Sequence, residues 1–199
     1  MNKIESLVAP QTKEFVTLCR RYFEYIGKLP DKKISDFWTM QLQLLPDIYR
    51  GIFFLPQVTA RYSSEVEKFV TEREYNKIFS SLVSHIGALD KFYDFSDLSH
   101  PGAVKMIEVS LSEMLTDIYQ ELKDFVLLYE TGTLENMNDA IADCLDTFGR
   151  FWGVKLLAAT RIIHVNLYQQ RYAEAKKTSQ IDEELEEVMA ENDDYDEEL

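Results

Sequence analysis

Residues 104–172 read VKMIEVSLSEMLTDIYQELKDFVLLYETGTLENMNDAIADCLDTFGRFWGVKLLAATRIIHVNLYQQRY, and this stretch decides the fold. In each half, apolar residues recur mostly at spacings of four and three, which is the stripe that one face of an α-helix presents to a core. The first stripe comprises Leu111, Leu115, Ile118, Leu122, Phe125 and Tyr129, and the second comprises Ile141, Leu145, Phe148, Trp152, Leu156, Ala159 and Ile163. Between them, Thr131-Gly132-Thr133 is short, and Gly132 can adopt the left-handed conformation that closes a helix. Two long antiparallel helices are therefore predicted. The extra spacing of four from Trp152 to Leu156 fits a locally unwound seam.

Helix signals continue on the N-terminal side of this hairpin. Pro10 is predicted to open a helix, because a proline at the first helical position loses no intrahelical hydrogen bond, and Ser35 is predicted to cap the next helix. Pro46 lacks a backbone N–H and its ring clashes with the preceding turn, so this second helix is predicted to kink or restart there. Thr71-Glu72-Arg73-Glu74 has the spacing of a capping box, which predicts a helix over about residues 72–90.

The remaining segments complete the expected architecture. Lys91 to Gly102 places aromatic residues among Asp and Ser and is predicted to be a loop with aromatic anchors, and no alternating run predicts a sheet. The sequence therefore predicts an all-α fold, an antiparallel bundle of about five to seven helices with a long C-terminal helical hairpin. Residues 1–178 are expected to form a single helical-bundle domain, and residues 179–199 an acidic tail that is either a short amphipathic helix or disordered.

The net charge of −14 is concentrated in this tail. Residues 179–199 hold eleven of the 35 acidic residues and no basic residue, so residues 1–178 carry 24 acidic and 21 basic residues. Nucleic-acid affinity comes mainly from clustered Lys and Arg that replace the counterions of the phosphate backbone. Direct binding of DNA or RNA is therefore not expected.

Features that report on location favour the cytoplasm. Cys19 and Cys144 lie inside helical patterns far apart in the sequence, as expected of reduced thiols that serve as small buried hydrophobes. The first residues lack the apolar run of a signal peptide, and no run approaches the roughly 18 apolar residues that a membrane-spanning helix needs. A cytoplasmic protein without a membrane partner is predicted.

Short motifs within the central stretch carry a family resemblance. Ser110 to Lys123, Trp152-Gly153 and Ala158 to His164 resemble an uncharacterised bacterial family that is known only as a numbered domain of unknown function. The resemblance runs from the first helix through the second arm of the hairpin and implies an all-helical fold, but it implies no activity. In many members of that family, His residues flank the Trp-Gly pair where this chain has Phe151 and Lys155, which disfavours a histidine-based site here.

Sequence motifs of known chemistry are missing. The chain has no Glu-x-x-His pair of a di-iron bundle, no phosphate-cradling Gly-rich loop, no nucleophile elbow, and no His-Glu-x-x-His or Cys-x-x-Cys motif. Enzymatic activity is therefore disfavoured, and no catalytic residue, metal site or cofactor is predicted. Groups on distant helices can still meet in space, so a pocket between the two arms of the hairpin remains an alternative.

This alternative pocket draws on both arms. Arg161 and His164 share one sector of the second arm, where they would face acids of the first arm such as Asp117 or Asp124. The ligand-pocket candidates are Asp117, Tyr119, Glu121, Trp152, Arg161 and His164. An ordinary structural role is the competing interpretation, with Trp152 in the core and Asp117 as the buried partner of an arginine.

The acidic tail differs in kind from the body. Ile181, Leu185, Val188 and Met189 form a short apolar face on an otherwise acidic segment, with the spacing of an amphipathic helix that docks into a groove. The segment buries too little apolar surface to order by itself. It is either a solubilising tail or a recognition helix, and these four residues are the partner-binding candidates.

Three functions fit these observations. The leading prediction is a non-enzymatic cytoplasmic adaptor or regulator that binds an unidentified protein partner, with a homo-oligomer as a further option. The alternative is a small-molecule-binding or catalytic bundle that uses the pocket between the two long helices. The third is an acidic accessory subunit of a nucleic-acid-processing enzyme, which would bind that enzyme and not naked DNA.

Overall fold

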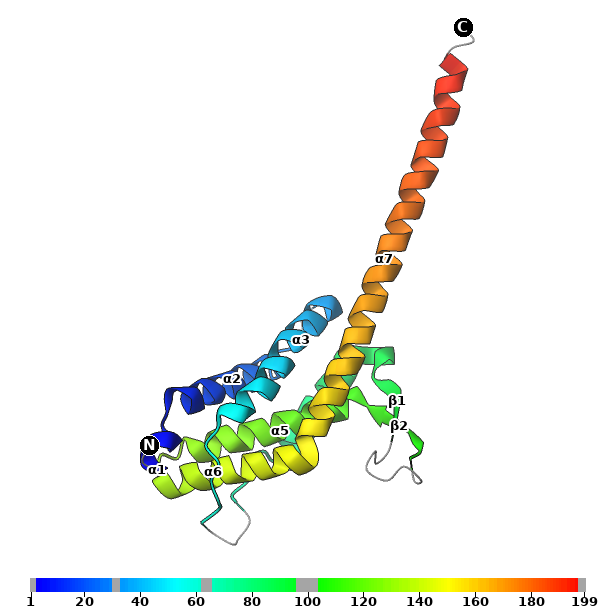
Figure 1. Ribbon diagram of the computed structural model, residues 1–199. Helices are drawn as coiled ribbons and strands as arrows, with labels where there is room; N and C mark the ends of the chain where they lie inside the picture. Colours follow the sequence, from blue (N-terminus) through cyan, green and yellow to red (C-terminus); the bar gives the residue numbers. More distant parts are fainter. Residues whose placement is uncertain (1–2, 30–32, 62–65, 96–103, 197–199) are drawn as a thin grey trace.

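The computed structural model describes residues 3–29, 33–61, 66–95 and 104–196, and Figure 1 shows their arrangement. Its central element is helix α5 (Leu111–Tyr129), of whose 19 residues 13 are buried. Helix α5 contacts α2 (Pro10–Ile26), α4 (Glu72–Ile86), α6 (Leu134–Thr147) and α7 (Gly153–Asp196). The helical bundle expected from the sequence is thereby confirmed.

The predicted hairpin is formed by α5 and α6, which lie side by side (Figure 1). The Ser110 hydroxyl caps α5 by accepting a hydrogen bond from the backbone N–H of Glu113 at 3.2 Å. For this reason the helix begins at Leu111 and not near Val104. Gly132 has a φ of +84°, the left-handed conformation that the short connection requires.

The second arm changes direction after α6. A short π-helical segment, η3 (Phe148–Trp152), separates α6 from α7, and α7 leaves the bundle at an angle to α6 (Figure 1). A π segment adds a residue to a helical turn and is a recognised cause of bends. The irregular spacing at Trp152 thus marks a change of helix geometry, and one extra residue rotates the faces of α7 by about 100° relative to a continuous α-helix.

Two further helices complete the bundle, with α2 against α5 and α3 (Ile34–Gly51) against α2 and α7. Helix α2 begins at Pro10, as predicted. Helix α3 continues through Pro46 without the predicted restart and ends in the 3₁₀ turn η1 (Ile52–Phe54). The predicted cap at Ser35 is wrong, because the helix begins one residue earlier and Ser35 lies in its first turn.

Helix α4 shows the predicted cap in part. The Thr71 hydroxyl accepts a hydrogen bond from the backbone N–H of Glu74 at 3.2 Å, as a capping box requires. The Glu74 carboxylate instead binds Tyr119 and Lys123 of α5. One half of the capping box is thus used to join two helices. The 3₁₀ turn η2 (Gly87–Leu89) follows α4 and completes the predicted span.

The prediction of a loop without a sheet is wrong for residues 91–95. Strand β1 (Lys91–Phe95) pairs antiparallel with β2 (Met106–Ser110), with Lys91 opposite Ser110. Residues 96–103 of the predicted loop lie outside the described residues. Phe92 and Asp94 point to the half-buried face of the strand. Because Asp94 is charged, the sequence lacks the alternation of apolar and polar residues that would have predicted a strand here.

The core is built from the inner faces of these helices. Its largest fully buried side chains are Trp38, Trp152, Tyr22, Phe15 and Phe37. Helix α1 (Lys3–Leu7) closes one end, where the Tyr129 hydroxyl donates to the Leu7 carbonyl at 2.7 Å. Cys19 and Cys144 are buried with free thiols, as predicted, and burial raises the pKa of both. Within the described ranges, no helix combines the length and apolar character that crossing a membrane requires.

Candidate functional site

The carboxylate of Asp117 joins three helices. Its Oδ1 accepts a hydrogen bond from the Tyr75 hydroxyl of α4 at 2.7 Å, and its Oδ2 pairs with the ammonium group of Lys155 of α7. Burial and the contact with Asp117 raise the pKa of Tyr75, so its hydroxyl stays protonated and donates. The same ammonium group lies 4.0 Å from the ring centroid of Phe151. Asp117 is therefore a buried acid with a cationic partner, as the structural alternative expected, but the cation is a lysine.

Tyr119 belongs to a second contact between α4 and α5. Its hydroxyl donates to Oε1 of Glu74 at 2.5 Å, and the ammonium group of Lys123 pairs with the same oxygen. Burial opposes ionisation of Glu74, but the hydrogen bonds from Lys123 and Tyr119 outweigh it and lower the pKa of Glu74. These groups satisfy one another, so the cluster fastens two helices together.

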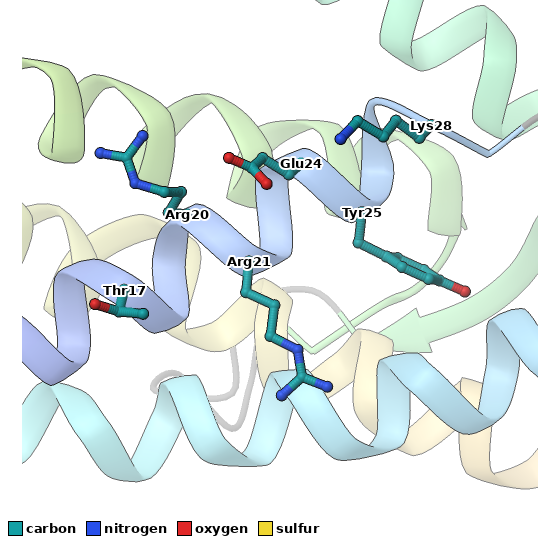
Figure 2. A pocket seen from close by; sticks show the side chains of 6 residues that line it. All are labelled: Thr17, Arg20, Arg21, Glu24, Tyr25 and Lys28. Carbon is teal, nitrogen blue, oxygen red and sulfur yellow. The ribbon is translucent and has the colours of Figure 1, made fainter.

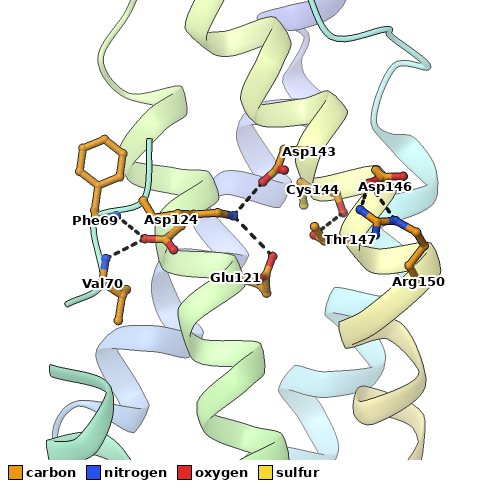
Figure 3. A network of polar contacts seen from close by, with 10 residues as sticks. Phe69, Val70, Glu121, Asp124, Asp143, Cys144, Asp146, Thr147 and Arg150 are labelled. Carbon is orange, nitrogen blue, oxygen red and sulfur yellow. Dashed lines mark hydrogen bonds and ion pairs between the residues drawn. The ribbon is translucent and has the colours of Figure 1, made fainter. Parts of the chain in front are cut away.

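Glu121 lies in a separate polar network, drawn in Figure 3. The ammonium group of Lys68 is 3.0 Å from Oδ2 of Asp143 and 3.9 Å from Oε2 of Glu121. Oδ1 of Asp124 accepts hydrogen bonds from the next two backbone N–H groups after Lys68, at 2.7 and 2.8 Å. Acids of α5 and α6 thus hold the extended segment that leads into α4.

Burial sets the electrostatics of this network. It raises the pKa of Glu121 and of Asp124, against the opposing effects of Lys68 on Glu121 and of the two backbone N–H groups on Asp124. In the part of the chain that the structure describes, no group of three or more His, Cys, Asp or Glu residues is placed to hold a metal ion. The network has the features of a structural anchor, because its charges and hydrogen bonds are directed at one segment of backbone.

The remaining ligand candidates lie on different sides of the second arm. Trp152 is fully buried and packs against a neighbouring phenylalanine ring, so it is a core residue. Arg161 and His164 are exposed, and the Arg161 guanidinium donates to Oδ1 of Asp94 in β1 at 2.7 Å. The expected approach of Arg161 to Asp117 does not occur, because Arg161 lies six residues, or about 9 Å, further along α7 than Lys155, which pairs with that acid. Among the described residues, the six candidates therefore occupy separate environments.

Arg161 and His164 instead line a groove between α3 and α7. The groove has a volume of ≈ 570 Å³, and its lining residues are Leu42, Pro46, Leu157, Thr160, Arg161, His164, Val165 and Tyr168. The guanidinium of Arg171 lies 5.3 Å from the ring centroid of Tyr168, which adds a second arginine at the edge. An apolar surface with cations beside it fits an acidic amphipathic helix better than it fits a closed reaction site. The sequence alone did not indicate the groove, because two helices distant in the chain form it.

A shallow hollow lies on the outer face of α2. Its lining residues are Thr17, Arg20, Arg21, Glu24, Tyr25 and Lys28. Figure 2 shows that Arg20 and Arg21 point to opposite sides of the helix, and Arg20 is engaged by Glu130. Catalysis requires groups that converge on a substrate in a fixed orientation. The side chains of this hollow diverge, so it is not a candidate active site.

The most exposed element is the second half of α7. Every residue from Arg171 to Ile181 is exposed, and the helix continues alone beyond the bundle (Figure 1). Of the partner-binding candidates, Ile181 is 56% exposed. Leu185, Val188 and Met189 lie on the same helix, but their side chains fall outside the described part of the chain. A helix that packs against nothing in its own domain is available to another molecule.

Two comparisons relate the chain to known proteins. Residues 7–169 match a family described as "Domain of unknown function (DUF5063)". The chain is also similar to the crystal structure of protein BF1032 from Bacteroides fragilis, with 30% sequence identity, a TM-score of 0.70, and coverage of 80% of this chain and 93% of that chain. No curated protein matches the chain. The family match ends just before Arg171, where α7 becomes exposed on all sides.

Proposed function

The chain belongs to the family described as "Domain of unknown function (DUF5063)", and from this premise we propose that it is a non-enzymatic adaptor or regulator that acts by binding another protein. The observation that carries the proposal is the second half of α7, where each residue from Arg171 to Ile181 is exposed. A helix gains most of its stability from packing an apolar face, and residues 171–181 expose every side chain to solvent. A protein partner would supply the missing burial.

The sequence of this half supplies a face for such a partner. Ile181, Leu185 and Val188 follow one another at spacings of four and three, as the anchors of a groove-binding helix do. Acidic residues fill most positions between them, so a basic or mixed surface on the partner gives charge complementarity. The same charges oppose the approach of nucleic acid. An accessory subunit of a nucleic-acid enzyme would be one special case of this function.

We place this function in the bacterial cytoplasm. Free thiols at Cys19 and Cys144 suit a reducing compartment. A solved structure with 30% identity comes from the bacterium Bacteroides fragilis. Both observations support the assignment, which subcellular fractionation of the native host tests directly.

A small-molecule pocket between the arms has less support. The acids that it requires are already engaged, Asp117 by Lys155 and Glu121 by Lys68. A ligand that bound these acids would have to displace Lys155 from Asp117, which would leave a partly buried ammonium group without its carboxylate and is costly. The protein-binding function needs no such rearrangement.

Affinity capture from native lysate tests the proposal by comparing the full-length chain with a truncation that ends at Lys177. Among the side chains of α7 that the structure describes, Leu167, at 3% exposed, is the last core residue, and residues 178–181 are all exposed. Circular dichroism and thermal unfolding verify that the bundle remains folded. We expect mass spectrometry to find a partner that is held by the full-length chain and lost on truncation.

A second comparison tests whether binding of the partner depends on the apolar face of this segment or on its charge. A full-length variant with Ile181, Leu185 and Val188 changed to Ser keeps the length and the net charge, and we expect it to lose the partner. The matched control changes Gln180, Ala190 and Asn192 of the same segment to Ser, and we expect it to retain the partner. Absence of any captured protein in all samples, or equal capture by the truncated chain, would contradict the proposed role of α7.

A further inference from the structure

Helix α7, of 44 residues, carries opposite charges in its two halves. Residues 153–178 contain five basic residues and one acidic residue, whereas residues 179–196 contain nine acidic residues and no basic residue. Acidic side chains near a helix C-terminus oppose the helix macrodipole, and neighbouring acids on one helix repel one another. The acidic end of α7 therefore carries an unfavourable electrostatic energy that contact with a basic surface would relieve.

The groove between α3 and α7 offers such a surface. Arg161 and His164 are part of its lining, and Arg171 stacks over Tyr168 at its edge. Arg161 already binds Asp94, yet its side chain remains 57% exposed and keeps donors for a second acid. The apolar residues Leu42, Pro46, Leu157 and Val165 share this lining with Arg161, so an acidic amphipathic helix would find apolar contacts and arginines close together.

The acidic end of α7 cannot reach the groove of its own chain. The helix is continuous from Gly153 to Asp196, and it points straight away from the bundle (Figure 1). At a rise of 1.5 Å per residue, Leu185 lies about 26 Å along the axis from Tyr168. A groove of this kind that receives the acidic end must therefore belong to another molecule.

We propose that this occupant is the acidic end of α7 from a second copy of the chain, so that two copies associate through antiparallel α7 helices. The inference rests on the proposed function of α7 as the binding element, and it names the partner. In this arrangement residues 179–196 of each copy lie beside residues 157–172 of the other. Each copy contributes the same groove and the same acidic end, as a two-fold symmetric dimer requires.

Charge complementarity favours a second copy over an unrelated acidic protein. One chain carries both the basic groove and the acidic amphipathic segment, on opposite halves of the same helix. In an antiparallel pair, each of the two grooves binds the acidic end of the other copy. An unrelated acidic helix would bind in the groove of one chain but would leave the acidic end of that chain without a basic partner. The helix is also long enough, because residues 157–196 span about 60 Å.

Sedimentation of the full-length protein tests the association. We expect a dimer at about 50 mM NaCl that dissociates toward monomer at about 500 mM NaCl, because salt screens charge pairs. Arg171→Glu is expected to raise the dissociation constant by at least about fivefold, since it replaces attraction with repulsion. The matched control is Arg73→Glu, an equal charge change at an exposed position of α4, and it should leave the constant unchanged.

Engineered cysteines test the antiparallel geometry. Full-length copies with His164→Cys in the groove are mixed with copies carrying Met189→Cys in the acidic end, and we expect mixed disulfides to form on mild oxidation faster than in either sample alone. The control mixture pairs Met189→Cys with Arg73→Cys and should not cross-link. The native Cys19 and Cys144 are buried and do not compete.

The outcomes separate this inference from the proposed function. A monomer at both salt concentrations overturns the second-copy assignment, and so does a dimer that is indifferent to Arg171→Glu and forms no mixed disulfide. If the chain is a monomer but α7 still captures a different protein, the proposed function stands and only the second-copy assignment fails. If it is a monomer and captures nothing, both fail.

Discussion

The ammonium group of Lys155 in α7 pairs with the carboxylate of Asp117 in α5, and this contact fixes α7 to the central helix just after the π segment. The two side chains are largely buried, with exposed fractions of 26% and 11%. Because the Tyr75 hydroxyl of α4 also donates to Asp117, three helices meet at one carboxylate. Asp117, which the sequence suggested as a ligand-pocket residue, thus has a structural role.

Replacing Asp117 by Ala tests that task. The change leaves the Lys155 ammonium and the Tyr75 hydroxyl without their acceptor, so we expect the free energy of unfolding to fall by about 2–4 kcal/mol. Tyr75→Phe removes a single hydrogen bond and should cost about 1 kcal/mol. Urea unfolding followed by circular dichroism measures both. Wild-type stability for Asp117→Ala would show that the carboxylate does not hold the helices.

Asp124 is expected to be an anchor for the segment that precedes α4. Asp124→Ala leaves the backbone N–H groups of Phe69 and Val70 unpaired, and we expect a loss of about 2–3 kcal/mol. Hydrogen exchange of these two amides should accelerate more than exchange elsewhere. The control is Asp146→Ala, which removes an exposed ion pair with Arg150 and should produce no measurable change. Unchanged exchange at residues 69 and 70 would contradict the anchoring role.

Stability should depend on pH in opposite ways through Glu121 and Glu74. Burial raises the pKa of Glu121 in the folded state, so folding favours its protonated form. The wild type then loses stability as pH rises from about 4.3 through the raised pKa. Glu121→Gln removes that loss, and its stability relative to wild type should rise as the pH increases from about 4.3 through the raised pKa.

Glu74→Gln is the variant that should show the opposite dependence of stability on pH. Burial opposes ionisation of Glu74, but the hydrogen bonds from Lys123 and Tyr119 outweigh it and lower its pKa. The wild type therefore gains stability as pH rises from the lowered pKa to about 4.3 and keeps that gain above it. The stability of Glu74→Gln relative to wild type should fall over this range. Urea unfolding at a series of pH values checks both variants, and changes of the same sign would refute this assignment.

Gly153 is expected to be required at the junction of the π segment and α7. A Cβ atom there would lie 2.5 Å from the Phe148 carbonyl oxygen and 2.9 Å from its ring atoms, whereas a Cβ at Gly149 would meet nothing within 4 Å. Gly153→Ala should therefore destabilise the protein by about 1–3 kcal/mol. Gly149→Ala should be neutral or stabilising by up to about 1 kcal/mol, because Ala loses less backbone entropy on folding. Thermal unfolding of the two variants compares them, and equal melting temperatures would argue against the close approach.

Local sequence signals predicted the bundle well. Gly132 at positive φ closes the central hairpin, Thr71 caps α4 and Pro10 opens α2, each as expected. Strand β1 was missed because Asp94 places a charge on its inner face, where its partner is the distant Arg161. The irregular spacing at Trp152 predicted a locally unwound seam in one long helix, whereas the structure has a π segment there and a separate helix α7 after it.

By itself, the sequence determined the helices, the central hairpin and the separation of a nearly neutral body from an acidic end. These features depend on residues a few positions apart, through helical period, capping and charge composition. Only the tertiary structure decided that Lys155 and not Arg161 meets Asp117, and that Leu42 and Pro46 join α7 in a groove. The physical reason is that Lys155 and Arg161 lie about 9 Å apart along α7, so their partners depend on how that helix is placed against its neighbours. Side chains on separate helices then find their partners through packing, which spacing along the chain does not encode.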